Sequence, residues 1–394
     1  MISALGYSRH VIERASPILT LTLPLVLAAI AVALWGDELT QRVAILMFIN
    51  LCMVVGLQTF MGNSGVASFG HVGFMLLGAY GTILFSLNSA EKTLVLPDMP
   101  SSWSIHSMHL PFDLALLCTG ICVATIAGLV GVPLLRIGAS AFGLASFAFL
   151  VVVRVVAVSS DALTNGTRTL VGIPEYTTLA GVTIWALAFI GTAYAFKESR
   201  WGLKLRASRE DPRAARSLGI DTVRLRWVAW ILSAFMTAVA GGLWAHYVTV
   251  FSPVDFWVSI AFVIISMLVV GGQGSVAGAV VGAVVITVVS QVLANAENAV
   301  NLARGTSDVV AHWIPRDLVG VPEFAVAAGL IVSLIFRPRG IMDGREISLR
   351  SFRRLAPSRA PLDGSPPVGD ETLTSGSGHP SRGTKVEGGS KGDA

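Results

Sequence analysis

The stretch PILTLTLPLVLAAIAVALW, residues 17–35, sets the character of the whole chain. It contains no charged residue and is close to the roughly 20 apolar residues that a helix needs to cross a bilayer. The whole chain is similarly apolar: its 394 residues are 53% hydrophobic and only 13% charged, with a mean hydropathy of +0.70. An ordinary soluble domain is about 25% charged. Lipid is therefore the predicted solvent for most of this protein.

Further apolar runs of similar length follow the first one. Inside lipid every backbone polar group must be satisfied internally, and uninterrupted helices achieve this segment by segment. We therefore predict an all-α integral membrane protein, a polytopic bundle of about 10 (8–10) transmembrane helices. The predicted spans are residues 17–35, 43–60, 70–87, 112–135, 140–158, 179–196, 226–249, 256–271, 275–294 and 321–336.

The first run also has some features of a secretory signal. Arg9 and Arg14 precede it, and the sequence 31–33 is Ala-Val-Ala, which is typical of a cleavage site. The run is longer than a typical signal core, however, and further spans follow at once. An uncleaved first helix is therefore favoured over a cleaved signal peptide.

Basic residues gather in the polar loop between the sixth and seventh spans, and the positive-inside rule places that loop in the cytoplasm. Six predicted spans precede the loop and four follow it, so both termini are predicted to be cytoplasmic as well. Basic residues near both ends of the membrane portion agree with this orientation. The loop holds Lys197, Arg200, Lys204, Arg206, Arg209, Arg213, Arg216, Arg224 and Arg226.

Two domains are predicted, a transmembrane domain over residues 1–344 and a disordered cytoplasmic tail over 345–394. In the tail Ser, Gly, Pro and charged residues dominate, and such a composition cannot bury enough apolar surface to fold. Four arginines at its start could touch anionic lipid head groups, but a simple basic flank that sets topology is the favoured interpretation. They are Arg350, Arg353, Arg354 and Arg359.

The stretch GLQTFMGNSGVASFGHVGFMLLGAYG, residues 56–81, interrupts an apolar region with glycine and polar residues. A polar break at membrane depth is tolerated where it is buried in protein or lines a water-filled cavity. It therefore predicts a discontinuous helix and a solute pathway. The alternatives are that 61–69 is only a turn between two complete spans, and that the histidine is simply packed. The pathway candidates are Asn63, Ser64, Gly65, Ser68 and His71.

Two series of small residues at four-residue spacing predict close helix packing rather than chemistry. One is Gly120, Ala124 and Gly128, and the other is Gly274, Gly278 and Gly282. Arg154 lies within an apolar run, where a charge is costly in lipid, and it is predicted to face the bundle interior or to reach the nearer interface.

The loop ESRWGLKLRASREDPRAARSLGIDTVRLRW, residues 198–227, contains signals of a short helix outside the membrane. The sequence 209–212, Arg-Glu-Asp-Pro, is typical of a helix start, because acidic residues favour the first turn and proline suits an early helical position. Gly219 is a plausible stop. A short amphipathic helix between two spans is therefore predicted.

Four segments of the chain together resemble one known family. The stretch 207–219 resembles the cytoplasmic coupling loop of the branched-chain amino-acid permeases of ABC importers, and 251–283 resembles that family's outer loop, following span and Gly-Gly-x-Gly-Ser turn. The region 62–81 is similar to its glycine-rich Gly-His segment, and 336–341 to its closing Arg-Pro-x-Gly signature. The sequences at 63–65 and 165–168 depart from the commoner family patterns, which puts the substrate in doubt more than the family.

The resemblance implies a permease subunit of a bacterial inner membrane that moves branched-chain or related small amino acids by alternating access. Its implied partners are a second, related permease, two cytoplasmic ATPase subunits and an extracytoplasmic solute-binding protein. The chain has no G-x-x-x-x-G-K-[ST] loop, so no cofactor is expected in it, and ATP and Mg²⁺ would be bound by the ATPases. The implied coupling residues are Arg209, Glu210, Asp211, Ala214, Ala215 and Gly219.

Other functions remain as alternatives. Urea or short amides could be the solute within the same family. An ion-coupled secondary transporter is less favoured, because carboxylates are nearly absent from the apolar runs, and a channel is a further alternative. No catalytic or metal site is predicted, since His106 and His109 lack a metal motif with glutamate and no Ser, His and Asp arrangement can be argued. The chain is therefore not expected to be an enzyme.

Overall fold

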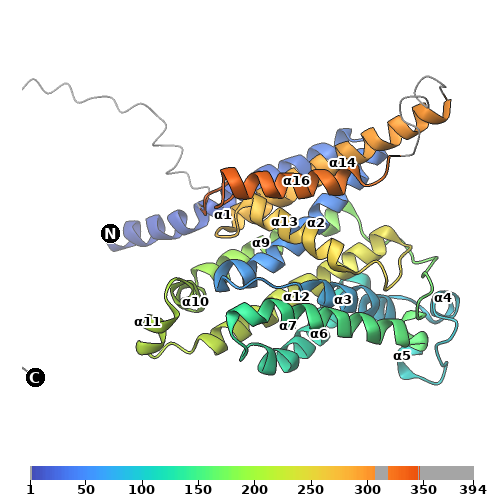
Figure 1. The fold of residues 1–394 in the computed structure, drawn as a ribbon, viewed down its shortest axis with the longest axis horizontal. Coiled ribbons are helices and arrows are strands. Elements are labelled where there is room, and N and C mark those ends of the chain that lie inside the picture. Colours follow the sequence, from blue (N-terminus) through green and yellow to red (C-terminus); the bar gives the residue numbers. More distant parts are fainter. Residues whose placement is uncertain (1, 307–317, 345, 347–394) are drawn as a thin grey trace, which may run out of the picture. The chain divides into compact units, whose positions relative to one another are not determined.

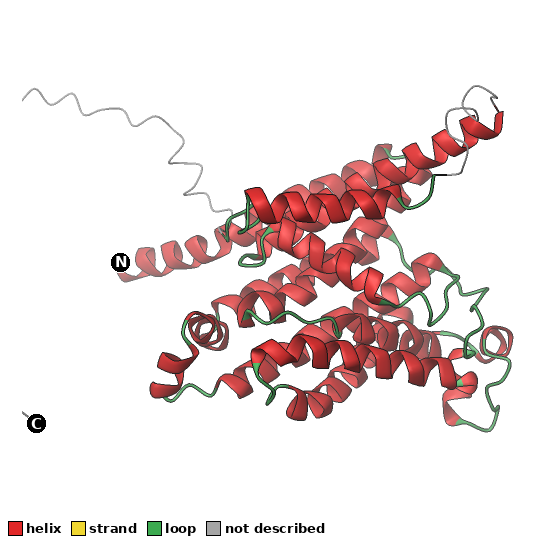
Figure 2. Ribbon diagram, in the orientation of Figure 1, coloured by secondary structure: helices red, strands yellow, loops and turns green. Residues whose placement is uncertain are grey.

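The computed structural model describes residues 2–306, 318–344 and 346, and its regular elements in these ranges are helices (Figure 2). A single antiparallel bridge there pairs Leu170 with Phe251. The predicted tail, 345–394 with its arginines 350–359, lies outside the described residues except for Glu346. The helices are α1 Ile2–Trp35, α2 Glu38–Ser64, α3 His71–Ser86, α4 Ser89–Val95, α5 Ser104–Ser107, α6 Phe112–Leu134, α7 Ala139–Ser159, α8 Asp161–Thr164, α9 Leu179–Glu198, α10 Arg200–Glu210, α11 Pro212–Ser217, α12 Thr222–Val248, α13 Val258–Gly271, α14 Val276–Thr306 and α16 Val321–Phe336.

Each predicted span coincides with one of these helices (Figure 1). Seven helices of the described chain are long and apolar enough to cross a membrane, and three shorter apolar ones, α3, α13 and α16, complete the set. The predicted all-helical, polytopic fold is thereby confirmed. Figure 1 places α10 and α11 at one end of the bundle and α4 and α5 at the other.

Helices α2 and α12 form the centre of the bundle. From Phe48 to Ser64 nearly every residue of α2 is buried, and α12 is similarly enclosed. Helix α2 packs against α9, α12 and α14, while α12 also packs against α3 and α6. Movement at the end of α2 must therefore be accommodated by several neighbours.

Glycines let α3 and α12 touch backbone to backbone. A Cβ atom added at Gly78 would lie 2.0 Å from the carbonyl oxygen of Ala238, and one at Gly241 would lie 2.1 Å from that of Met75. No side chain fits such gaps, so both positions require glycine. Small residues at helix contacts play the same part in other membrane bundles.

The predicted packing of the small-residue series is confirmed for four of its glycines. Gly120 and Gly128 on α6 face side chains of α12. On α14, a Cβ at Gly282 would lie 1.8 Å from the carbonyl oxygen of Met267, and one at Gly278 would lie 2.3 Å from that of Gly272. Gly274 differs, because it precedes α14 and its nearest neighbour is Gly344 in the C-terminal turn.

Helix α1 carries an apolar stripe on its outer side. Its opposite side packs on α2 and α9 and buries Leu21, Leu25 and Ala29. Lipid tails are as apolar as leucine, so an exposed apolar stripe has a natural solvent in a bilayer. The exposed residues are Leu19, Leu23, Leu27, Ile30 and Leu34.

Two charged side chains in and near the apolar bundle have protein partners. The guanidinium of Arg154 in α7 lies 4.3 Å from the ring centre of Trp257, the residue before α13. The two side chains form a cation–π contact. At the end of the bundle that holds α4 and α5, the Nζ of buried Lys92 donates to the carbonyl oxygens of Ile105, at 2.7 Å, and Met108. Burial lowers the pKa of Lys92.

Candidate functional site

The loop between α9 and α12 folds into two short helices, α10 and α11. The side chain of Asp211 caps α11 by accepting hydrogen bonds from the backbone N–H groups of Arg213 and Ala214, both at 2.9 Å. Pro212 takes the first helical position. Gly219, with φ of +73°, lies just beyond the end of α11. The predicted short helix is confirmed, and it ends at the predicted glycine.

The beginning of this loop differs from the prediction. Arg209 and Glu210 were predicted to begin the short helix, but they form the last turn of the separate helix α10. Ser199 caps α10 by accepting from the backbone N–H of Gly202, at 3.2 Å. Because α10 has a strongly charged sequence without an extended apolar face, hydropathy gave no signal for it. Asp211 stands between the two helices and redirects the chain.

The predicted coupling residues form an exposed charged surface with apolar residues among them. Glu210, Asp211, Ala214 and Gly219 are exposed, whereas Ala215 is buried and attaches α11 to the loop. Leu218 is 79% exposed. A groove of about 360 Å³ runs between α10 and the start of α12, and its lining includes Trp201, Lys204, Leu218, Gly219, Ile220 and Arg224. An exposed surface of this mixed character suits contact with another protein.

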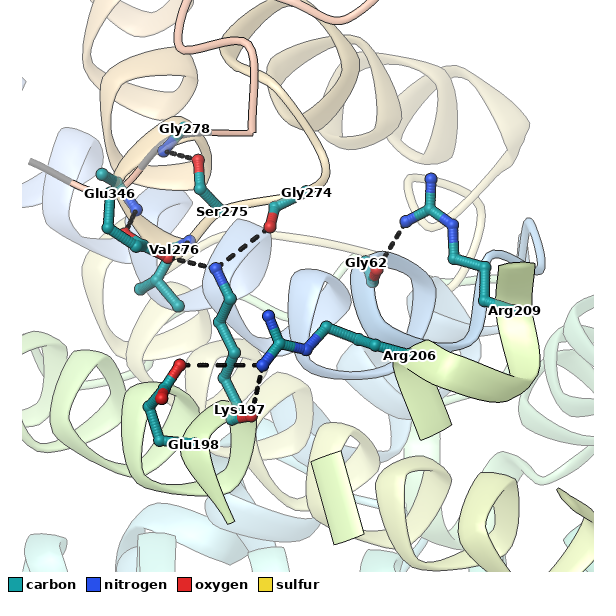
Figure 3. A network of polar contacts seen from close by, with 11 residues as sticks. Gly62, Lys197, Glu198, Arg206, Arg209, Gly274, Ser275, Val276, Gly278 and Glu346 are labelled. Carbon is teal, nitrogen blue, oxygen red and sulfur yellow. Dashed lines mark hydrogen bonds and ion pairs between the residues drawn. The ribbon is translucent and has the colours of Figure 1, made fainter. Parts of the chain in front are cut away.

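Arg209 brings the coupling residues and the predicted pathway residues together. Its Nη1 donates to the carbonyl oxygen of Gly62, at 2.8 Å (Figure 3). Its side chain also lies over Gly65. Gly65 ends α2 with φ of +70°, and a Cβ there would lie 2.7 Å from the Cγ of Arg209. The exposed loop is thus bonded directly to the end of the central helix.

The break in the apolar region is shorter than its sequence suggests. Helix α2 continues through Asn63 and Ser64, and α3 begins at His71, so the irregular stretch is residues 65–70. The Nδ2 of Asn63 donates to the carbonyl oxygen of Thr59, at 2.9 Å, which keeps this side chain local to α2. The Oγ of Ser64 accepts from the backbone N–H of Val66, at 3.3 Å.

His71 lies in a closed environment beside this break. One ring nitrogen lies 2.9 Å from the Oγ of Ser68 and the other 2.7 Å from the Oγ of Ser233 in α12. Aromatic rings surround it, with the ring centre of Trp230 at 5.1 Å. Asn63, Ser64, Ser68 and His71 are all buried, whereas Gly65 is exposed. Of the five pathway candidates, Ser68 and His71 are thus in direct contact, and Gly65 is open beside Arg209 of α10.

Trp230 is the centre of this aromatic group. Its ring makes edge-on contacts with those of Phe60, Phe74 and Phe142, with ring centres 5.0–5.5 Å apart. Its Nε1 donates to the carbonyl oxygen of Ala127 in α6, at 3.1 Å. Residues of α2, α3, α7 and α12 thus meet at one packed point beside the break.

The polar residue Gln58 on α2 was not among the sequence candidates. Its side chain is fully buried, and neither its Oε1 nor its Nε2 has a hydrogen-bond partner among the residues that the structure describes. The Oδ1 of Asn63 is buried and unpartnered as well. A buried polar group without a partner costs about 1–3 kcal/mol, so both amides are costly where they stand on α2. The sequence signal that could have identified Gln58 is the presence of a glutamine within an apolar run.

A second polar network joins the end of α9 to the start of α14 (Figure 3). The Nζ of Lys197 donates to the carbonyl oxygen of Gly274, at 3.0 Å, and forms an ion pair with Glu346. The carboxylate of Glu346 also accepts from the backbone N–H groups of Val276, at 3.0 Å, and Ala277, at 3.2 Å. Sequence reasoning missed this network, because Lys197 and Glu346 are far apart in the chain.

The Arg-Pro-x-Gly sequence forms a turn against the same region. Ile341 donates its backbone N–H to the carbonyl oxygen of Val270, at 2.9 Å, and Met342 to that of Gly271, at 3.1 Å. Gly340 has φ of +77°, and a Cβ there would lie 2.5 Å from the Cα of Gly272. The glycine of this signature is therefore required both by its conformation and by the close approach of another backbone.

Comparison with known proteins gives relatives along most of the chain. It is 23% identical over 346 residues to the high-affinity branched-chain amino acid transport system permease protein LivM of Escherichia coli (strain K12), which covers 77% of this chain and 70% of LivM. It is 31% identical over 160 residues to the corresponding LivH protein of Salmonella typhimurium, covering 37% of this chain and 49% of LivH. No solved structure matches the chain.

A shorter match is to a permease for a different solute. The nucleoside ABC transporter permease protein NupC of Lactococcus lactis subsp. cremoris is 34% identical over 73 residues, 18% of this chain and 23% of NupC. Residues 39–312, which include the break after α2 and the loop with α10 and α11, match the profile of one family. The chain therefore belongs to the family described as the branched-chain amino acid transport system permease component.

Proposed function

We propose that this chain is the membrane-spanning permease subunit of an ABC importer that moves branched-chain or related small amino acids across the bacterial inner membrane. Family membership supports transport as the activity. The solute class is supported by the relatives LivM and LivH, which are permeases of branched-chain amino acid transport systems. Transport would proceed by alternating access, driven by ATPase subunits that are separate chains.

The observation that carries the proposal is the hydrogen bond between Arg209 and Gly62. It joins α10, at the base of an exposed loop, to the last turn of the central helix α2. A partner that shifted α10 and α11 would pull directly on the end of α2 and on the break that follows it. Small shifts at one site are passed on in this way because packed elements move as units.

The partners follow from the same surface. Of the two cytoplasmic ATPases, one would dock on α10 and α11 of this chain. Both would bind ATP and Mg²⁺, since this sequence has no phosphate-binding loop of the P-loop type. A second, related permease would complete the membrane part, and relatives of two kinds, LivM and LivH, support this pairing. An extracytoplasmic binding protein would deliver the solute. The basic loop and the positive-inside rule favour cytoplasmic termini.

Uptake into vesicles that contain the assembled importer tests the coupling assignment. Gly219 has a left-handed conformation with open space around it, so G219V adds backbone strain of about 1–2 kcal/mol without a clash. G219N is the matched variant, because asparagine tolerates that conformation. We expect G219V and E210A to reduce ATP-dependent uptake and G219N to retain most of it. Normal uptake by E210A and G219V, with normal ATPase assembly, would remove the assignment.

Competition experiments distinguish the candidate solutes. Leucine should compete for uptake, while urea, a short amide or a nucleoside should not; the nucleoside arm is motivated by the match to NupC. Uptake by vesicles that contain this chain but no ATPase would instead support an ion-coupled transporter. These outcomes separate the solute class from the energy source.

A further inference from the structure

Three segments that are distant in sequence meet at the ion pair of Lys197 and Glu346. Lys197 lies in the last turn of α9, directly before the loop with α10 and α11. Glu346 follows the turn that contains the Arg-Pro-x-Gly sequence. Through Gly274, Val276 and Ala277 both side chains also bind the start of α14 (Figure 3).

The pair is largely shielded from solvent, with Lys197 buried and Glu346 partly exposed. The side chain of Lys197 is 3% exposed and that of Glu346 is 18% exposed. By contrast, the surface pair of Arg42 and Glu38 has exposures of 48% and 84%. Removing two charges from water is costly, so a buried pair is weak evidence for stability, and a role in fixing position must be considered. The N-terminus of α14 adds a favourable field for the Glu346 carboxylate.

The base of the exposed loop is fastened on two sides. On one side, Arg209 binds the end of α2 through Gly62. On the other side, an Nη atom of Arg206 donates to the carbonyl oxygen of Lys197, at 3.0 Å, so α10 is joined to the residue that holds α14. The second connection reaches α13 as well, because Ile341 and Met342 bind the end of that helix.

We propose that Lys197 and Glu346 are positioning residues that carry displacement of α10 and α11 to α13 and α14. The pair holds the C-terminal turn and the start of α14 on the base of the loop, so that these segments move together with it. This inference rests on the proposed function, because it assumes that a partner displaces the loop. It adds a second transmission route beside the one through Arg209 and α2.

Neutral variants of each partner test the proposal in the assembled importer. K197M and E346Q each leave one buried charge without its partner, whereas the double variant K197M/E346Q removes both charges. Replacing a buried pair by well-packed hydrophobic residues of similar volume is often neutral for stability, and methionine at position 197 follows this rule. The glutamine at position 346 keeps a side-chain oxygen that can accept a hydrogen bond. K197R keeps a cation and serves as the conservative variant. R42M and E38Q, which break the exposed pair, are the matched controls.

The measured quantity is solute taken up per ATP hydrolysed, with assembly and thermal unfolding followed in parallel. We expect K197M and E346Q to lower this ratio by about tenfold, the scale found when residues that link two sites are changed. K197R, R42M and E38Q should stay near the wild type. The double variant should recover assembly and stability but keep the low ratio. A double variant that recovers the ratio together with its stability, or single variants with an unchanged ratio, would overturn the proposal.

Hydrogen exchange gives a readout that does not depend on transport. In K197M/E346Q the backbone N–H groups of Val276, Ala277, Ile341 and Met342 should exchange faster than in the wild type, because the carboxylate that holds these segments is gone. Unchanged exchange would overturn the proposal whatever the uptake. If the wild-type importer showed no ATP-dependent uptake, the proposed function would fail, while the exchange experiment would still decide whether the pair holds α14.

Discussion

At the scale of single residues, the C-terminal turn shows why its glycines are not equivalent. Gly340 and Gly344 both have left-handed backbone conformations, with φ of +77° and +70°. A Cβ at Gly340 would collide with the backbone of Gly272, whereas one at Gly344 would meet no atom of the described residues within 4 Å. Substitution at either position therefore strains the backbone, but only substitution at Gly340 also causes a steric clash.

We expect G340A to destabilise the protein more than G344A. Both variants strain the backbone, but only G340A forces two backbones apart, and overpacking of this kind costs about 1–3 kcal/mol. The midpoint of thermal unfolding in detergent measures the difference. Equal unfolding midpoints for the two variants would mean that Gly340 is not in close backbone contact with Gly272.

Sequence reasoning identified single residues where local rules decide their conformation. Asp211, Pro212 and Gly219 were predicted correctly as helix signals, because capping and left-handed conformations depend on near neighbours. Lys197 and Gln58 were missed, since their environment depends on segments distant in the chain. The roles assigned to the pathway residues, such as His71, stay predictions.

At the scale of elements, the contact between α13 and α14 depends on glycine. A Cβ at Gly282 would lie 1.8 Å from the carbonyl oxygen of Met267, so the helices could not keep their present distance. Gly191 in the middle of α9 has no atom within 4 Å of such a Cβ. Substitutions at these two glycines therefore distinguish the effect of helix–helix contact from the effect of helix propensity.

We expect G282A to destabilise the bundle and G191A to be neutral or stabilising. Alanine favours a helix over glycine by about 1 kcal/mol, and at Gly191 this is the only effect. At Gly282 the clash with a carbonyl oxygen outweighs it. Thermal unfolding of both variants in the same detergent compares them, and a stabilised G282A would contradict the observed packing of α13 on α14.

Hydropathy predicted all of the membrane helices but not the elements outside the apolar runs. The long apolar runs produce helices because lipid leaves the backbone no other partners. Helix α10 was missed because its sequence is charged and its position depends on Arg209 binding the carbonyl of Gly62, which is distant in the chain. The break after α2 was predicted too long, since the last turn of α2 continues to the left-handed Gly65.

At the scale of the whole molecule, the two ends of the bundle carry different loops. The basic helices α10 and α11 lie at one end and α4 and α5 at the other (Figure 1). The proposed orientation places the first pair in the cytoplasm and the second outside. Ser217 and Ser101 are exposed at these two ends and offer positions for chemical labelling.

We expect S101C, but not S217C, to react with a membrane-impermeant maleimide added to intact cells. Both variants are made after Cys52, Cys118 and Cys122 have been replaced, so that only the new thiol reacts. S217C should react once the membrane is permeabilised. The reverse pattern in intact cells would invert the proposed topology and remove the ATPase docking surface with it.

The aromatic group around Trp230 has a practical consequence for spectroscopy. Its indole is fully buried beside the break, in contact with rings from three other helices. Indole emission shifts to longer wavelength when water reaches the ring, so the difference between wild-type and W230F spectra isolates an intrinsic optical reporter. Recorded during ATP hydrolysis, that difference spectrum would show in real time whether water reaches the ring of Trp230.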